Sequence, residues 1–432
     1  MFKLGVRILT GAFVTGSTIL FTKNKPATNN NTDFTNTNLE SNTNYTSASC
    51  GSNFIDHNFV QGKLGNCGMI ASMATLKSNS ELYNKVVPSG QNFKKSFLFN
   101  TNNQSEFAFN LYKLGKLHKV VVDESLPTYG FFNSYLYSKS SNGSLLGSLL
   151  EKALIQLLFD GEYEAATGVL GHHVLTSFTN NLFEIYLRDS SNSGNYAIAP
   201  NLKLHDLVDH GLTTKSQMVV GFDREASKYS SLKPDHVYTL VDINDNSVTL
   251  YNPHGTTLFI SKRLFFDHLD LLEISYFKNN LFKIPSIQTS LEFTDTWPAL
   301  KFYQNEHVIE YDLFIEEDDT EVLINLITKP DSELMTYCCL TTKFDPEKNR
   351  YKQYSNPFSL RANLNRGKYR VHFELMNNIT LDSESCEQFL KYLENGGNEF
   401  VFRLAASKKC SINKKGMFSY FIDLLKIIFF LD

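Results

Sequence analysis

A cysteine in a glycine-marked segment is the first residue of this chain that could perform covalent chemistry. In QGKLGNCGMIASMATLKS, glycines at positions 62 and 65 precede Cys67, and an apolar-periodic run through Ile70, Met73 and Leu76 follows it. The pattern predicts a loop that ends where a helix begins, at Cys67. The partial positive charge of a helix N-terminus favours the thiolate, which is the nucleophilic form. This segment alone leaves open that Cys67 is an inert packed thiol.

An attacking thiolate also needs hydrogen-bond donors for the oxyanion that it generates. The backbone N–H at the start of the helix can supply one donor, and a side-chain amide just upstream can supply another. Gln61 precedes Cys67 in the same loop and is our candidate for the second donor.

A candidate base and a group to orient it lie in the segment DHVYTLVDINDNSVTLYNPHG. The segment alternates as two strands around a turn at residues 244–246. Positions 236 and 252 are symmetric about 244, so a hairpin hinged there places His236 opposite Asn252. The amide can then hold one imidazole nitrogen and leave the other to face a thiol. His236 alone is more simply explained as an ordinary strand histidine, but together with Cys67 and Asn252 it predicts acyl transfer by a thiol.

These motifs resemble those of the calpain family of cysteine proteases. QGKLGNC is similar to the family's nucleophile motif, and DHVYTL and YNPHG are similar to its histidine and asparagine motifs. The segments LHKVVVDESLP (117–127) and LLEKALIQLLFDGEYEAATG (149–168) resemble family sequence between them. The resemblance implies that Cys67 is the nucleophile, His236 the base and Asn252 its orienting amide, with Gln61 in the oxyanion hole.

Four positions depart from the pattern that the resemblance sets. The family normally has tryptophan directly after the nucleophile and in the asparagine motif, where this chain has Gly68 and His254. Its usual aspartate before the nucleophile and glycine before the histidine are replaced by Asn66 and Asp235. None of these changes removes a catalytic group, but they alter how two lobes would close on a substrate. We expect His254 to be a wall residue of the cleft and not a second base.

The fold class predicted is α+β: a papain-like two-lobed cysteine protease core followed by an antiparallel β-sandwich. Helical periodicity marks GSLLGSLLEKALIQLLFDG and KLHDLVDHGL, and VVVDESLP is typical of a short buried strand. After about residue 284 the chain consists of short alternating runs, such as EYDLFIEE and KYRVHFELM, separated by turn residues. These runs resemble the calpain-type β-sandwich, so the resemblance covers about residues 51–408.

The expected organisation has six parts. They are an apolar N-terminal segment (1–22), an Asn/Thr-rich disordered linker (23–50), a first lobe with the nucleophile (51–168), a second lobe with the histidine and asparagine (169–283), the sandwich (284–408) and an apolar C-terminal helix (409–432). The first segment, interrupted by Arg7, is a candidate signal peptide, membrane anchor or presequence, or else a buried helix. The last carries Asp423 and Lys426, and we expect it to dock on the protein more readily than to contact a membrane.

Composition limits the remaining options. The chain has 41 Lys and Arg against 45 Asp and Glu, a net charge of -4, without a basic block that would grip nucleic acid. Its six cysteines are scattered without CxxC spacing, which argues against a disulfide framework or a zinc site and favours a reducing, cytoplasmic location. Either apolar end could add membrane association, and secretory or organellar targeting stays open.

Metal ligation is not expected from the two candidate clusters. His172 and His173 are adjacent, so on a strand they would point to opposite sides, and other ligands are not nearby. The acidic run 316–319 with Glu321 is typical of a solvated strand end, although the resemblance links acidity there to calcium or electrostatic control. No cofactor is required for the chemistry, and calcium is a candidate activator. An EF-hand loop pattern is not found in the sequence, and the resemblance implies that calcium would act by bringing together the two catalytic lobes.

The function predicted is that of a calpain-like cysteine endopeptidase that hydrolyses protein substrates through a thioester. The alternative is a calpain-like scaffold without proteolytic activity that binds partners or lipid. A thiol transferase of the transglutaminase type shares the triad logic, but it normally orients its histidine with aspartate and not with an amide such as Asn252.

Overall fold

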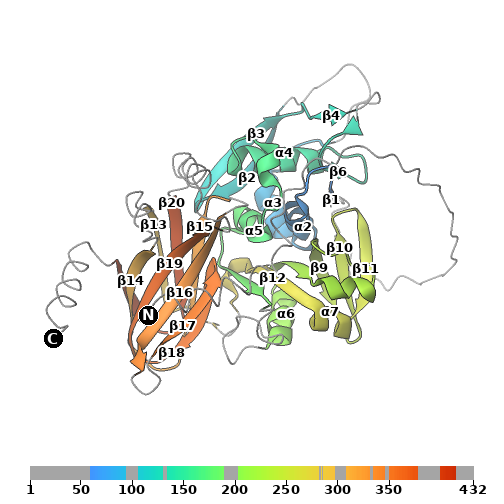
Figure 1. The fold of residues 1–432 in the computed structure, drawn as a ribbon. Helices are drawn as coiled ribbons and strands as arrows, with labels where there is room; N and C mark the ends of the chain where they lie inside the picture. The colour runs from blue at the N-terminus through green and yellow to red at the C-terminus, as the bar shows by residue number, and fades with distance from the viewer. Residues whose placement is uncertain are drawn as a thin grey trace.

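The computed structural model has a mixed α+β fold. It describes residues 59–93, 106–129, 134–188, 203–281, 284, 286–296, 308–330, 334–345, 350–377 and 399–414. The predictions for the N-terminal segment, for the linker, and for residues 415–432 lie outside the described residues. Figure 1 shows three parts: a helical part at the top, a curved sheet at the lower right, and a pair of sheets at the left.

The helical part, residues 59–168, gathers around the helix that begins at Cys67. Its elements are β1 (Phe59–Val60), α2 (Cys67–Thr75), η1 (Leu76–Ser78), α3 (Ser80–Val86), β2 (Glu106–Lys113), β3 (Lys116–Asp123), β4 (Thr128–Tyr129), β5 (Ser134–Tyr135), β6 (Lys139–Ser140), α4 (Leu146–Leu158) and η2 (Tyr163–Ala166). The apolar face of α4 packs with α2 and the β2–β3 hairpin in one core. The segment predicted as a buried strand is the hairpin strand β3, of which Val120 and Val122 are buried while the residues between and beside them face solvent.

The second part is a six-stranded antiparallel sheet with strand order β11-β10-β9-β8-β12-β7. Its elements are α5 (Gly171–Thr179), β7 (Phe183–Leu187), α6 (Leu204–Thr213), β8 (Gln217–Phe222), η3 (Arg224–Lys228), β9 (Val237–Ile243), β10 (Ser247–Asn252), β11 (Thr256–Ser261), α7 (Lys262–His268), β12 (Leu269–Ser275) and η4 (Phe277–Asn279). Helices α2 and α5 lie between this sheet and the rest of the helical part (Figure 1).

The third part, here called the double sheet, contains antiparallel sheets of four and five strands, ordered β13-β20-β15-β18 and β17-β16-β19-β14-β21. The strands are β13 (Thr289–Thr296), β14 (Val308–Ile315), β15 (Thr320–Thr328), β16 (Leu334–Asp345), β17 (Arg350–Pro357), β18 (Ser359–Leu364), β19 (Gly367–Asn377), β20 (Glu399–Ala406) and β21 (Cys410–Lys414). Residues from both sheets form one core that includes Phe373, Phe400 and Phe402. The prediction that a helix begins at residue 409 is wrong for residues 410–414, because they pair with β14.

The double sheet covers the open edge of strand β7. The N–H of Phe183 donates to Asn325 Oδ1 at 2.9 Å, and Asn325 Nδ2 donates back to the Phe183 carbonyl at 2.6 Å. The N–H of Ile185 donates to Ser359 Oγ at 2.9 Å. Side chains of β15 and β18 thus satisfy the edge groups that a neighbouring strand would otherwise pair, and the edge is protected from pairing with another chain.

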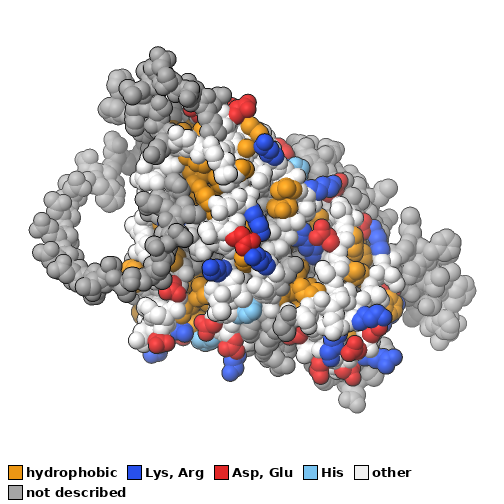
Figure 2. Space-filling model, turned by 180° about the vertical axis from the view of Figure 1, so that it is seen from behind, with side chains coloured by type: hydrophobic (Ala, Val, Ile, Leu, Met, Phe, Trp, Pro, Cys, Tyr) orange, Lys and Arg blue, Asp and Glu red, His pale blue; other side chains and the backbone are white. Residues whose placement is uncertain are grey.

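The described surface is mixed in character. Figure 2 shows Lys and Arg interspersed with Asp and Glu on the visible face, with small apolar areas between them. Within the described ranges, no helix has the length and apolar character needed to cross a bilayer.

Candidate active site

Cys67 is the first residue of helix α2, as its sequence pattern predicts. The helix is buried along its whole length except at Cys67, which is half-buried. One contact links the helix to the start of α5: Ser72 Oγ donates to the Gly171 carbonyl at 3.2 Å, and it also lies 2.8 Å from the Gly68 carbonyl of its own helix. The thiol therefore occupies a fixed position where a buried helix meets the surface.

The environment of the thiol opposes its ionisation in this conformation. Burial raises the pKa of Cys67 above 9.0, and the negative charge of Glu273 adds to that effect. The backbone N–H groups of Val237, Gly68 and Cys67 itself act in the opposite direction, because they would stabilise a thiolate. The resting thiol is thus neutral, and an assembled site needs a further partner to take its proton.

His236 and Asn252 are joined by a hydrogen bond. His236 Nε2 lies 2.9 Å from Asn252 Oδ1, and both side chains are buried, at 9% and 6% exposure. Because an amide oxygen can only accept, Nε2 carries the proton and Nδ1 is left as the acceptor. Burial lowers the pKa of His236 to about 4, with smaller lowering effects from His254 and Lys233, while the bond to Asn252 acts upward. A neutral imidazole with a free Nδ1 is the form that a general base requires.

The register of the hairpin differs from the symmetric one that the sequence predicts. Strands β9 and β10 pair Tyr251 with Thr239, and a bulge lies between Thr249 and Leu250. This pairing places Asn252 across from Tyr238, two residues from the expected partner His236. Because side chains alternate, residues 236 and 238 share a face, and the longer histidine side chain reaches Asn252 diagonally.

Three contacts hold the hairpin against the helical part. Thr239 Oγ1 on β9 donates to the Ala71 carbonyl of α2 at 2.6 Å. Tyr251 Oη donates to the Phe59 carbonyl at 2.6 Å, and the backbone N–H of Gln61 donates to the Pro253 carbonyl at 2.8 Å. These contacts bring both halves of the candidate triad to one seam, although Cys67 makes no hydrogen bond to His236 in this conformation.

Gln61 lies beside this seam but its amide is engaged elsewhere. Its Nε2 donates to the Leu64 carbonyl at 2.7 Å, and its Oε1 is buried without a hydrogen-bond partner. The second N–H of Nε2 is the one that could donate a hydrogen bond to an oxyanion. The unpartnered Oε1 can only accept, so it would be satisfied by a donor and not by the oxyanion.

The departures from the expected pattern have local structural causes. Asn66 donates from Nδ2 to Glu151 Oε1 at 2.7 Å, where an aspartate would face a like charge. A Cβ atom added at Gly68 would lie 2.4 Å from the carbonyl oxygen of Val169, so the backbone as it stands admits only glycine. Asp235 has a φ of 56°, a left-handed conformation that a glycine adopts without strain and aspartate tolerates better than most residues.

His172 and His173 are on helix α5 and not on a strand, which corrects that expectation. Both are buried, and His172 Nδ1 lies 3.1 Å from Glu273 Oε1. Burial lowers the pKa of His172 to about 3 and that of His173 well below its usual range, so both are neutral at physiological pH. Among the residues that the structure describes, no group of three His, Cys, Asp or Glu side chains is arranged to hold a metal.

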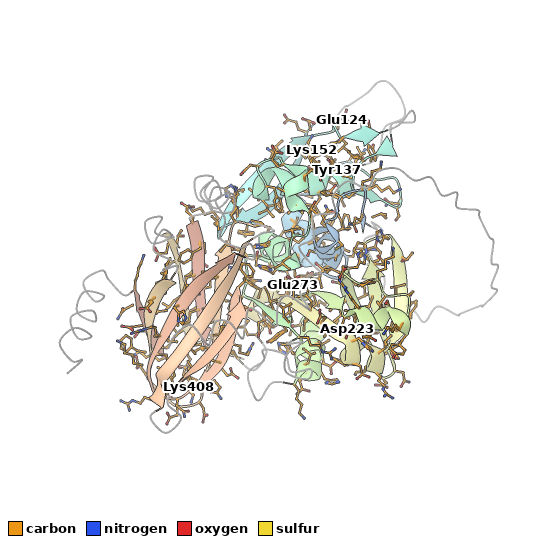
Figure 3. All side chains as sticks on the ribbon, in the orientation of Figure 1. Glu124, Tyr137, Lys152, Asp223, Glu273 and Lys408 are labelled. Carbon is orange, nitrogen blue, oxygen red and sulfur yellow. The ribbon has the colours of Figure 1, made fainter. Side chains whose placement is uncertain are left out.

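Glu273 is a buried residue near the site that the sequence reasoning missed. It lies in the middle of the molecule (Figure 3) and accepts the backbone N–H of Gly171 at 2.8 Å and of His172 at 3.3 Å. Burial raises its pKa to about 7. An acid inside the apolar strand LDLLEIS was the available signal, since a charge at a buried strand position needs a dedicated partner.

The acidic run between β14 and β15 is bound by neighbouring basic and backbone groups. Glu316 pairs with Lys409 at 3.2 Å, and Asp318 Oδ1 accepts the backbone N–H of Arg366 at 2.8 Å. Glu321 Oε2 lies 4.0 Å from Arg361 Nη1. The run therefore forms a solvated strand connection tied to the double sheet.

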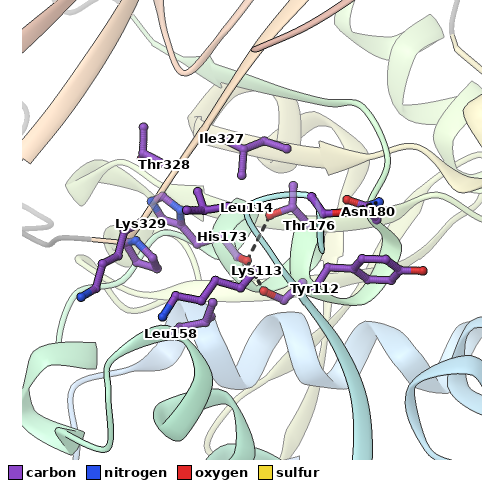
Figure 4. Close-up of a pocket in the computed structure, with 13 residues that line it drawn as sticks. Tyr112, Lys113, Leu114, Leu158, His173, Thr176, Asn180, Ile327, Thr328 and Lys329 are labelled. Atoms are coloured by element: carbon purple, nitrogen blue, oxygen red, sulfur yellow. Dashed lines mark hydrogen bonds between the residues drawn. The ribbon is translucent and has the colours of Figure 1, made fainter. Parts of the chain in front are cut away.

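A small cavity lies away from the triad, between α5, the end of β2 and the double sheet (Figure 4). Its volume is about 20 Å³, and His173, Lys113 and Lys329 are among its lining residues. This volume is room for a single water. None of the predicted site residues lines it, so it is not the substrate cleft.

The chain is similar to members of one known protein family. The family model described as "Calpain family cysteine protease" matches residues 14–262. Mouse calpain-8 and the chicken calpain-1 catalytic subunit are each 29% identical over 204 residues, which is 45% of this chain and 27% of the relative. Calpain-B of Drosophila melanogaster is 34% identical over 126 residues, 29% of this chain and 13% of the relative. The match thus spans about a quarter or less of the length of these relatives.

Proposed function

The chain belongs to the calpain family of cysteine proteases, and we propose that it is an active endopeptidase that hydrolyses protein substrates through a thioester. The observation that carries the proposal is the hydrogen bond from His236 Nε2 to Asn252 Oδ1 at 2.9 Å, at the same seam as Cys67. That bond fixes the tautomer in which Nδ1 can take a proton. A satisfied structural histidine would have no need of this arrangement beside an N-terminal helix cysteine.

The proposed reaction has two halves. Nδ1 of His236 takes the thiol proton, and the Cys67 sulfur attacks the peptide carbonyl carbon. The backbone N–H of Cys67 and the amide of Gln61 donate to the oxyanion, and the imidazolium then gives its proton to the leaving amine. In the second half His236 takes a proton from water, the hydroxide attacks the thioester, and the thiol leaves with that proton. Asn252 holds the ring throughout.

The resting geometry requires a closing movement before this chemistry. Cys67 is not hydrogen-bonded to His236, and burial keeps its thiol neutral. Bringing the two side chains into contact requires free energy that substrate or an ion must supply by binding the closed form better. We propose calcium as the candidate activator. It would act on a papain-like pair of lobes, and the double sheet would form a β-sandwich beside them.

The missing hydrogen bond between Cys67 and His236 also favours one rival, a calpain-like scaffold without proteolytic activity. A site in which thiol and imidazole stayed apart would bind partners but not turn over. The intact set of Cys67, His236, Asn252 and Gln61 supports the enzyme. We also propose a cytoplasmic location, consistent with the free thiols of Cys67 and Cys410; membrane association through either end of the chain remains a separate proposal.

A labelling experiment on the full chain tests the proposal. The protein is treated with an epoxide or vinyl-sulfone probe across a calcium series, the adduct is mapped, and hydrolysis of a fluorogenic peptide is followed in parallel. We expect labelling at Cys67 and peptide hydrolysis that rise together with calcium. Labelling at Cys338 or Cys50 in place of Cys67 refutes the nucleophile, and labelling of Cys67 without hydrolysis at any calcium concentration favours the scaffold.

A further inference from the structure

The ring of His254 lies flat against the ring of the candidate base. The two imidazole planes are 5° from parallel and their centroids are 4.8 Å apart, which is an offset stack. On another side of His236 the buried ring of Tyr238 meets it edge-on, at 88° and 4.9 Å. His254 is exposed at the surface of the seam, whereas His236 is buried beneath it. The imidazole of His236 is therefore in contact with two other rings.

The backbone of His254 is tied to the same hydrogen bond that orients the base. Its N–H donates to Asn252 Oδ1 at 3.0 Å, so one amide oxygen accepts from both His254 and His236. The loop geometry that presents the His254 ring is thus set by the main chain. A substitution of the side chain alone leaves this tie in place, which makes the ring testable by itself.

We propose that His254 is a positioning residue of this site: its neutral ring holds the plane of His236, and its protonated ring opposes the charge that His236 must acquire during catalysis. The inference rests on the proposed protease function. In this role His254 controls the acid side of the pH–activity profile. A ring that cannot be protonated, such as that of phenylalanine, would not have this effect.

The electrostatic half of the argument follows from the geometry. In the reaction His236 becomes an imidazolium, and a second positive charge 4.8 Å away disfavours that state. Lys233 acts on both rings in the same direction, while the carboxylate of Asp235 faces Arg224 at 3.7 Å. Burial and Lys233 lower the pKa of His254 below its ordinary 6.5, so its effect falls in the mildly acidic range. Above that range His254 is neutral and permits the chemistry.

Coulomb's law sets the size of the effect. Two unit charges at the distance of the stack interact with an energy equivalent to about 0.6 pH units in bulk water and about 2.5 pH units in a partly buried setting. Because His254 is exposed, the lower part of this range applies. We expect a shift of about half to one pH unit.

The test compares two substitutions of His254 with a matched control. His254→Phe keeps a flat ring without a charge, and His254→Ser removes the ring. His205→Phe is the control, since His205, on helix α6, is also exposed and also packs against a ring, that of Phe266, with centroids 3.8 Å apart and planes tilted by 33°. The readouts are kcat and KM for a peptide from pH 4.5 to 8, and the His236 ring titration followed by NMR of selectively labelled histidine.

His254→Phe should keep kcat/KM at pH 7.5 within about threefold, raise the pKa of His236, and move the acid limb down by about half to one unit. His254→Ser should lower kcat about tenfold with KM nearly unchanged, because the base is less well oriented. His205→Phe should change neither. An unmoved His236 titration and acid limb in His254→Phe overturns the proposal, as does a change in His254→Ser confined to KM. If the native protein shows no peptidase activity, the proposed function fails, yet the NMR titration still decides the coupling of the two rings.

Discussion

The buried ion pair between Arg361 and Glu184 gives the sharpest stability prediction. Arg361 lies on β18 of the double sheet and Glu184 on β7 of the six-stranded sheet, and both side chains are 2% exposed. Arg361 Nε donates to Glu184 Oε2 at 2.9 Å, and Nη2 donates to Oε1. The phenols of Tyr276 and Tyr186 also donate to this carboxylate. We predict that Arg361→Met strongly destabilises the fold.

The magnitude follows from what the substitution leaves behind. Removal of one partner from a buried ion pair strands an uncompensated charge, which costs about 3–5 kcal/mol. Two phenol donors remain on Glu184, so we expect the lower end, about 3 kcal/mol. The double variant Arg361→Met/Glu184→Gln should recover most of that loss, because a neutral amide still accepts from the phenols. The interaction energy in this cycle should exceed about 2 kcal/mol.

The pH dependence distinguishes this explanation from a simple packing defect. In the native protein Arg361 and the phenols hold the pKa of Glu184 below its ordinary 4.5, so the pair's stability is present above pH 4.5 and is lost as pH falls further. In Arg361→Met, burial without a cation raises that pKa. The variant's deficit should therefore be small near pH 4.5 and should grow as the pH rises toward 8. Urea unfolding at pH 5, 6.5 and 8 measures it.

A surface ion pair supplies the control. Arg263 and Asp267 are paired at 3.3 Å on α7, but their side chains are 91% and 57% exposed. Arg263→Met should change the free energy of unfolding by less than about 0.5 kcal/mol at every pH. A loss under about 1 kcal/mol for Arg361→Met, or a deficit that does not depend on pH, would refute the reasoning.

Three further predictions concern the candidate triad and the helix that carries it. Cys67→Ala should abolish peptidase activity and probe labelling, and adding His236→Ala should cost little more, since triad members act as a unit; labelling that persists contradicts the assignment. Asn252→Ala should lower kcat by at least about tenfold with KM nearly unchanged, and steady-state kinetics showing a change in KM alone would place this amide in the substrate cleft. Gly68→Ala should destabilise the fold by about 1–3 kcal/mol in urea unfolding and slow labelling, because the added Cβ meets the Val169 carbonyl at 2.4 Å; unchanged values would show that the backbone can yield.

The sequence predicted which residues would meet at the site, but not the register that brings them together. Symmetry about residue 244 placed His236 opposite Asn252, whereas the hairpin pairs Tyr251 with Thr239 and contains a bulge. The contact forms nonetheless, because a shift of two residues keeps a side chain on the same face. A shift of one residue would have turned His236 to the other side. Alternation is readable from local sequence, but a bulge depends on how the strands pack.

Helix α5 shows a different limit of prediction. Two adjacent histidines carry no strong local preference, and the expectation for His172 and His173 places them on a strand. The start of the helix is stabilised from a distance: Glu273 on β12 accepts the N–H groups of Gly171 and His172, the donors that a capping side chain would normally satisfy. The ring of His172 packs at 4.6 Å from that of Phe358 in the double sheet. Neither partner is near in sequence, so local periodicity could not reveal the helix.

The boundary expected at residue 284 separates two types of element, but the interactions across it are those of one folded body. Removal of the double sheet would leave the amide of Ile185 and both backbone groups of Phe183 without the side chains that now satisfy them. It would also remove Arg361, so the carboxylate of Glu184, whether buried or newly exposed, would lose its cationic partner. Unsatisfied edge groups invite pairing with other chains, and an unpaired acid opposes folding. Strand β7 pairs with β12, and β12 carries Glu273. The negative charge of Glu273 contributes to raising the pKa of Cys67. The double sheet therefore supports the six-stranded sheet behind the nucleophile. For this reason peptidase activity and its response to calcium should be measured on the whole chain.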